Sequence, residues 1–115
     1  MLLDLSQIEI YVRPGQTDMR KAINSLAIMV QDYMYQNPLS GSLYLFCNRQ
    51  RRIFKALYWD RNGFCLWQKK LEKHKYPWPM TQEDAQQISS EQLSLLLKGI
   101  DFWHEHTALK YSQVS

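Results

Sequence analysis

The chain has 115 residues, of which 45% are hydrophobic and 13% aromatic, and it carries a formal net charge of +3. This composition excludes a disordered chain and predicts one packed domain over residues 1–115, with its core at about 8–103 and residues 104–115 as a frayed tail. The two cysteines, Cys47 and Cys65, are too few for a disulfide scaffold, and we expect them to be small core residues. No stretch reaches the ~18 apolar residues of a membrane span and no basic leader starts the chain, so we expect a cytoplasmic protein without membrane contact.

The first elements are a short strand and a long helix. Residues 8–12 alternate and are rich in β-branched side chains, which predicts a strand, and Pro14-Gly15 predicts a turn after it. Thr17 has the character of an N-cap. Apolar residues then recur every three or four positions, which predicts an amphipathic helix from about Asp18 to Tyr35.

Three further strands follow, at residues 43–47, 53–60 and 63–71. The polar segment 48–52 has the length of a hairpin turn, and Asn62-Gly63 is typical of a type I′ turn, so the three strands should form an antiparallel meander. We expect the long helix to pack on one face of this meander. The residues expected to be buried are Leu43, Leu45, Leu57, Leu66, Ile23, Leu26 and Val30.

The C-terminal part predicts short helices. Thr81 and Ser89 are each followed three residues later by a side chain that suits a capping pair. Leu93, Leu96 and Leu97 form an apolar stripe after the second of these positions. The predicted fold class is therefore α+β: an antiparallel β-meander with one long amphipathic helix packed on it and short C-terminal helices.

The sequence offers no convincing catalytic group. Metal-dependent DNA cleavage needs two or three converging acidic ligands, whereas Asp60 falls in a predicted turn and Glu72 follows a strand with no third acid to join them. His104 and His106 supply only two of the three or four ligands that a zinc site requires. We therefore expect no enzyme activity, no metal and no cofactor.

The strongest functional pattern is a basic, aromatic middle. Residues 49–75 contain nine Lys or Arg and two acids, a local charge of +7, whereas the first 48 residues carry −1 and the last 40 carry −3. Lys and Arg neutralise phosphates and exposed aromatic rings stack on unpaired bases, so this stretch predicts nucleic-acid binding. The alternative is that the aromatic rings form the core and the cations only solvate the rim of a sheet. The candidate nucleic-acid-binding residues are Arg49, Arg51, Arg52, Lys55, Lys69, Lys70, Lys73 and Lys75.

A second hypothesis is a protein-interaction adaptor that does not touch DNA. Its candidate partner-binding residues are Leu93, Leu96, Leu97, Phe102 and Trp103. The alternative is that this C-terminal helix simply covers the sheet.

An ordered set of motifs resembles a known family. The motifs are residues 17–21 (TDMRK), 41–49 (GxLYxFxNR), 55–72 (KxLxWDxxGFxLWxKxLE), Trp78-Pro79 and 92–101 (QLxxLLxGID). Together they are similar to the TnpB-type accessory protein of the insertion sequence 66 (IS66) family. The resemblance implies a bacterial protein required for efficient transposition, encoded beside a larger DDE-type transposase and another element-encoded protein, with no established biochemical activity. The expected partners are therefore DNA at the transposon ends, the transposase and that other protein. The RNA-guided nuclease that shares the TnpB label is a different, much longer protein.

Overall fold

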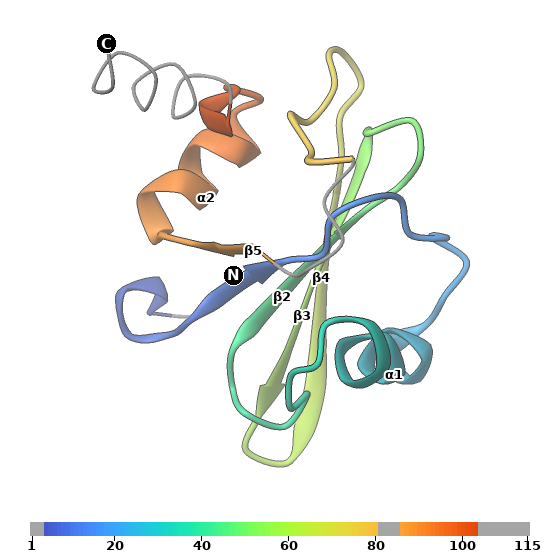
Figure 1. The fold of residues 1–115 in the computed structure, drawn as a ribbon, viewed down its shortest axis with the longest axis vertical. Coiled ribbons are helices and arrows are strands. Elements are labelled where there is room, and N and C mark those ends of the chain that lie inside the picture. The colour runs from blue at the N-terminus through green and yellow to red at the C-terminus, as the bar shows by residue number, and fades with distance from the viewer. Residues whose placement is uncertain (1–3, 81–85, 104–115) are drawn as a thin grey trace, which may run out of the picture.

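The computed structural model describes residues 4–80 and 86–103, which form an α+β fold with one five-stranded sheet (Figure 1). A single 3-10 turn, η1 (Leu5–Gln7), precedes the first strand. The other elements are β1 (Ile10–Val12), α1 (Ile23–Tyr33), β2 (Leu43–Cys47), β3 (Ile53–Asp60), β4 (Gly63–Lys70), β5 (Gln86–Ile88) and α2 (Ser90–Leu97).

The sheet is mixed and has the strand order β4-β3-β2-β1-β5. The strands β2, β3 and β4 pair antiparallel, as expected for three consecutive hairpin-connected strands. However, β1 pairs parallel with β2, because α1 carries the chain across the sheet between them, and β5 pairs antiparallel with β1. A purely antiparallel sheet was therefore an incomplete prediction. The strand β5 was missed because Gln86 and Gln87 give it no apolar alternation; it forms where Ile88 is buried opposite Ile10.

The two α-helices cover opposite faces of the sheet (Figure 1). On the α1 face, the buried residues are Leu26, Ala27, Met29, Val30, Met34, Tyr44, Phe46 and Leu57. On the α2 face, they include Ile10, Val12, Leu43, Leu45, Phe54, Ala56, Tyr76, Trp78, Leu93, Leu96 and Phe102. Of the residues expected in the core against the long helix, Leu43 and Leu45 are buried but face α2 instead. Ile23 and Leu66 are only partly buried. Of the two cysteines, Cys47 is buried in the core, where burial raises the pKa of its thiol to about 12, and Cys65 is half-buried.

The helix α1 begins five residues later than predicted, at Ile23, because residues 17–22 form a loop that the sheet holds in place. Thr17 is not its N-cap: its backbone N–H donates to the carbonyl oxygen of Cys47 at 2.8 Å, which continues the edge of β2. The Asp18 carboxylate accepts from the backbone and side chain of Arg20 rather than from a helix turn. At this position tertiary hydrogen bonds, and not the N-cap propensity of Thr17, determine the backbone conformation.

Two local predictions about turns and caps have different outcomes. Ser89 caps α2 with Gln92 in a capping box, as predicted. The turn between β3 and β4 is not centred on Asn62-Gly63: Gly63 already pairs with Asp60, and Arg61 takes the left-handed conformation, with φ 56°. The predicted helix start at Thr81 and the tail 104–115 lie outside the described residues.

Candidate nucleic-acid interface

The turn between β2 and β3 is built around one asparagine. The side-chain oxygen of Asn48 accepts from the backbone N–H groups of Arg52, at 2.9 Å, and Ile53, at 3.0 Å. The N–H of Arg51, a residue at φ 60°, donates to the Asn48 carbonyl oxygen at 3.0 Å. This short-range network explains why the turn is compact and leaves the side chain of Arg49 exposed at its tip.

The segment after β4 lies directly against this turn. The N–H of Leu71 donates to the Arg52 carbonyl oxygen at 2.8 Å, and the N–H of Tyr76 donates to that of Arg51 at 2.7 Å. In return, the guanidinium of Arg52 donates to the Glu72 carbonyl oxygen at 3.2 Å. The cations of residues 49–52 and those of residues 69–75 therefore lie at the same end of the sheet, although the two segments are separated in the sequence.

A further lysine joins them from the end of α2. Lys98 is exposed and lines a hollow of about 610 Å³ with Lys73, His74 and Lys75. Lys69 also reaches the end of α2, where its ammonium donates to the carbonyl oxygen of Leu97 at 3.4 Å. No local pattern in the sequence indicated Lys98, because only the tertiary fold brings the end of α2 beside residues 73–75. We call this surface the basic rim, and its members are Arg49, Arg51, Arg52, Lys69, Lys70, Lys73, Lys75 and Lys98.

Members of the basic rim differ in freedom. Arg49 and the lysines are exposed, whereas Arg51 and Arg52 are half-buried. Arg51 and Arg52 hold the rim together through their backbone carbonyl oxygens, and Arg52 also through its guanidinium. The exposed side chains, apart from that of Lys69, which contacts Leu97, can follow a phosphate backbone.

Lys55 does not belong to this surface, and its assignment as a nucleic-acid contact is corrected. The side chain lies on the α1 face and is only 7% exposed. Its ammonium donates to the carbonyl oxygens of Met19, at 2.9 Å, and Lys21, at 3.3 Å. A buried ammonium is costly unless it is hydrogen-bonded, so the role of Lys55 is to hold the loop of residues 17–22 against the sheet.

The aromatic residues near the rim also serve the core. Phe54 and Tyr76 are fully buried, with ring centroids 5.7 Å apart, and burial raises the pKa of Tyr76 to about 12. Trp78 is 4% exposed and its indole N–H donates to the Arg13 carbonyl oxygen at 2.9 Å. These three rings are not available for stacking on bases, so the charges of the rim carry the argument for DNA contact.

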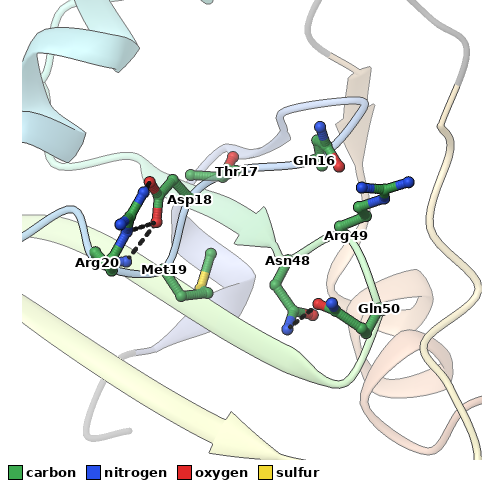
Figure 2. Close-up of a pocket in the computed structure, with 8 residues that line it drawn as sticks. All are labelled: Gln16, Thr17, Asp18, Met19, Arg20, Asn48, Arg49 and Gln50. Carbon is green, nitrogen blue, oxygen red and sulfur yellow. Dashed lines mark hydrogen bonds and ion pairs between the residues drawn. The ribbon is translucent and has the colours of Figure 1, made fainter.

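A polar pocket of about 600 Å³ lies beside the tip of the turn (Figure 2). Residues 16–20 form one wall and residues 48–50 form the other. On the first wall, Arg20 pairs with the Asp18 carboxylate at 2.7 Å, and its hydrogen bonds lower the pKa of Asp18 to about 2. Arg49 belongs to both this pocket and the basic rim. The pocket extends the polar surface of the rim onto the loop that Lys55 holds.

The proposed partner-binding stripe is largely core, which corrects that assignment. Leu93, Leu96 and Phe102 are at most 5% exposed and belong to the cluster on the α2 face. Leu97 and Trp103 are half-buried and pack against the same cluster. The helix covers the sheet, so these five side chains do not form a free apolar surface.

Exposed apolar side chains gather elsewhere, on the outer side of α1 and just after it. Ile28, Tyr35 and Leu39 are each more than half exposed. Tyr35 and Leu39 line an uncharged hollow of about 560 Å³. Periodicity alone could not predict this surface, because it places Tyr35 at the end of a helix, whereas α1 ends at Tyr33 and Tyr35 takes the left-handed conformation.

The described residues hold no cluster of three His, Cys, Asp or Glu side chains that could bind a metal ion. Asp60 is exposed in its turn, and Glu72 is exposed after β4. None of the helices in the described residues combines the length and the hydrophobicity of a membrane span. The two histidines His104 and His106 lie outside the described part of the chain.

Comparison with known proteins finds one matching family model and two relatives. A family model described as "IS66 Orf2 like protein" matches residues 8–107. Two relatives from Sinorhizobium fredii (strain NBRC 101917 / NGR234) carry the descriptions "Uncharacterized protein y4hO" and "Uncharacterized protein y4jC". The first is 36% identical over 114 residues, covering 99% of each chain; the second is 30% identical over 95 residues, covering 83% of this chain and 81% of the relative. No solved structure matches the chain.

Proposed function

The chain belongs to the IS66 Orf2-like family, and from this premise we propose that it assists DNA transposition by binding transposon DNA, or the complex of that DNA with the transposase, through the basic rim. The single observation that supports DNA contact is the convergence of cations from three separate segments on one end of the sheet. Backbone hydrogen bonds fix two of these segments to each other, since the N–H groups of Tyr76 and Leu71 donate to the carbonyl oxygens of Arg51 and Arg52.

The charge of the rim suits phosphate more than it suits solubility alone. Glu72 is the one acid in the 49–59 and 64–75 segments that build most of the rim. Each phosphate that a Lys or Arg neutralises releases counterions, which gives affinity without sequence preference. Such a contact would hold or bridge DNA while the chemistry is done by another protein.

The test compares charges inside and outside the basic rim by fluorescence anisotropy with a labelled duplex. The variant Arg49→Ala/Lys73→Ala/Lys75→Ala removes three exposed charges from the rim. It should weaken binding and lower the slope of log affinity against log salt by about 0.9 for each phosphate that the variant no longer neutralises. The matched comparison is between the single variants Lys73→Ala and Lys21→Ala, each of which removes one exposed charge; Lys21 lies outside the rim, and its variant should change little. Equal reductions in affinity in these two single variants, or no affinity of the wild type at low salt with and without transposase, would contradict the proposal.

In this proposal the protein contributes no bond-breaking chemistry. Purified protein with Mg²⁺ or Mn²⁺ should neither nick nor join DNA that carries the element's ends. Cleavage that survives repurification and disappears in Asp60→Ala would show that the assignment as a non-enzyme is wrong.

The second candidate function is an adaptor that contacts the transposase without DNA. The buried C-terminal helix does not support it, but the exposed group of Ile28, Tyr35 and Leu39 does. Tyr35 is also held in the left-handed conformation, at φ 55°, a strained backbone that presents the ring to solvent at 79% exposure. A pull-down of the transposase that is insensitive to salt and abolished in Tyr35→Ala/Leu39→Ala would favour this candidate, because an apolar interface is not screened by salt.

A further inference from the structure

Within the described residues, the strand β4 is the outermost strand on one side of the sheet, and β3 is its hydrogen-bonding neighbour. The direction of its backbone groups follows from one bond: the N–H of Leu71, just past the end of β4, donates to the carbonyl oxygen of Arg52, just before β3. Because N–H and C=O groups alternate in direction along an antiparallel strand, those of Phe64, Leu66, Gln68 and Lys70 point away from β3. The strand therefore presents a row of donors and acceptors along its outer edge.

This edge lacks the usual features that block pairing with another strand. Natural edge strands are shortened, bulged, or interrupted by proline or by charges. In contrast, β4 pairs with β3 residue for residue over eight positions, without a bulge or a proline. Its middle, residues 64–67, is apolar and half-buried, and its two lysines lie at one end. The opposite edge strand, β5, has only three residues.

We propose that two copies of the chain associate through β4, which pairs antiparallel with β4 of the second copy about a two-fold axis at Leu66. Hydrogen bonds between the two copies form only where an outward-facing residue of one β4 lies opposite an outward-facing residue of the other. The two-fold axis must therefore lie at a residue of β4 and not between two residues. With the axis at Leu66, Phe64 faces Gln68 of the second copy, and each such pair exchanges two hydrogen bonds. The two sheets join into one continuous sheet, and the outer edge of β4 is closed.

Charge complementarity selects this arrangement. The axis at Leu66 places Lys69 opposite Gly63 of the second copy, and Gly63 itself pairs with Asp60 on β3. A side chain added to Gly63 would meet nothing within 4 Å, so the space above it is open. The ammonium of Lys69 can reach across it to that Asp60 carboxylate in exchange for its long, 3.4 Å contact with the Leu97 carbonyl oxygen. The two-fold axis produces this contact twice. A parallel arrangement would instead set the lysine ends of the two strands side by side, where they repel each other.

The first test removes one outward N–H group. Gln68→Pro deletes an N–H group that would donate to a carbonyl oxygen of the second copy. This N–H does not donate to β3, so the monomer should keep its fold. Gln68→Thr is the matched control, because it changes the same exposed side chain and keeps the N–H. In sedimentation experiments on the full chain without DNA, the wild type and Gln68→Thr should be dimers and Gln68→Pro a monomer with an unchanged circular dichroism spectrum. A monomeric wild type, or a folded Gln68→Pro variant that still dimerises, would overturn the proposal.

The second test checks the register in which the two β4 strands pair, and it does not require the fold to tolerate a proline. Asp60→Lys and Lys69→Asp should each raise the dimer dissociation constant roughly 2- to 30-fold, because each removes two exposed ion pairs. The double variant restores opposite charges and should recover most of the affinity. A double variant no better than the weaker single variant would show that these residues do not meet. Neither test involves DNA, so its outcome is independent of the proposed function.

Discussion

Lys55 and the cations of the basic rim come from the same basic stretch of sequence, but the structure places them in different surroundings. The rim lysines are exposed at the end of the sheet and lie beside a hairpin turn and the end of α2. Lys55 lies in the middle of β3, under the loop of residues 17–22, and both of its described hydrogen bonds go to backbone carbonyl oxygens. A basic stretch of sequence can therefore be available to a phosphate backbone only where the fold leaves its charges exposed to solvent.

Removing the buried charge should have the strongest effect. Lys55→Met keeps most of the side-chain volume but leaves the carbonyl oxygens of Met19 and Lys21 without their donor. Hydrogen bonds to charged groups contribute ~1.5–3 kcal/mol, so we expect the free energy of unfolding to fall by about that amount in urea titrations. The control, Lys70→Met, should change stability by less than ~0.5 kcal/mol because its side chain is exposed.

The same two variants should have the reverse order of effects on DNA. Lys70→Met should reduce the salt slope of DNA binding by up to ~0.9, and Lys55→Met should leave it unchanged at temperatures where the variant is folded. If Lys55→Met flattens the salt slope while the protein is folded, the distinction between the two regions is wrong.

An intermediate effect is expected for Arg52, which takes part in both kinds of contact. Arg52→Ala removes a rim charge and also the bond from its guanidinium to the Glu72 carbonyl oxygen. We expect stability to fall by ~0.5–1.5 kcal/mol and DNA binding to weaken as well. Lys73→Ala, an exposed neighbour, should weaken DNA binding alone, and equal destabilisation by both variants would remove the structural role assigned to Arg52.

The weakest effect concerns the outer side of the loop that Lys55 holds. The hydrogen bonds from Arg20 lower the pKa of Asp18 from 3.8 to about 2 in the folded protein. A depressed carboxyl pKa contributes stability above the unfolded value, and this contribution is lost as the pH falls from about 4 to about 2. In Arg20→Gln the pKa of Asp18 should return towards 3.8, which a carboxyl ¹³C NMR titration measures directly. An unchanged pKa in that variant would show that the ion pair does not form in solution.

Much of the sheet could be predicted because its residues carry strong local patterns. The apolar runs at 43–47 and 53–60 have the bounds of β2 and β3, and Ser89 with Gln92 begins α2. The late start of α1 could not be predicted in this way. It depends on the contact between residues 17–22 and both Cys47 and Lys55, which are distant in sequence.

The candidate site shows the same division. Sequence patterning identified the cations in the β2–β3 turn and at the end of β4, since a meander puts these two segments at one end of the sheet. It misassigned Lys55 because an alternating strand pattern shows which face a side chain is on, but not what covers that face. It also assigned Leu93 and Leu96 to a surface for another protein, because an apolar stripe on a helix predicts burial but not what buries it. The sheet of the same chain covers these two side chains.

DNA binding by the basic rim can be tested residue by residue in an NMR titration of the ¹⁵N-labelled protein with a short duplex at low salt. We predict that the amide shifts concentrate at residues 49–52 and 69–75 and at Lys98, and that Ile28, Tyr35 and Leu39 are unaffected. Adding salt should reverse the shifts, because the contacts are to phosphate. Shifts centred on Ile28, Tyr35 and Leu39, or no shifts at any salt concentration, would contradict the claim that the basic rim binds DNA.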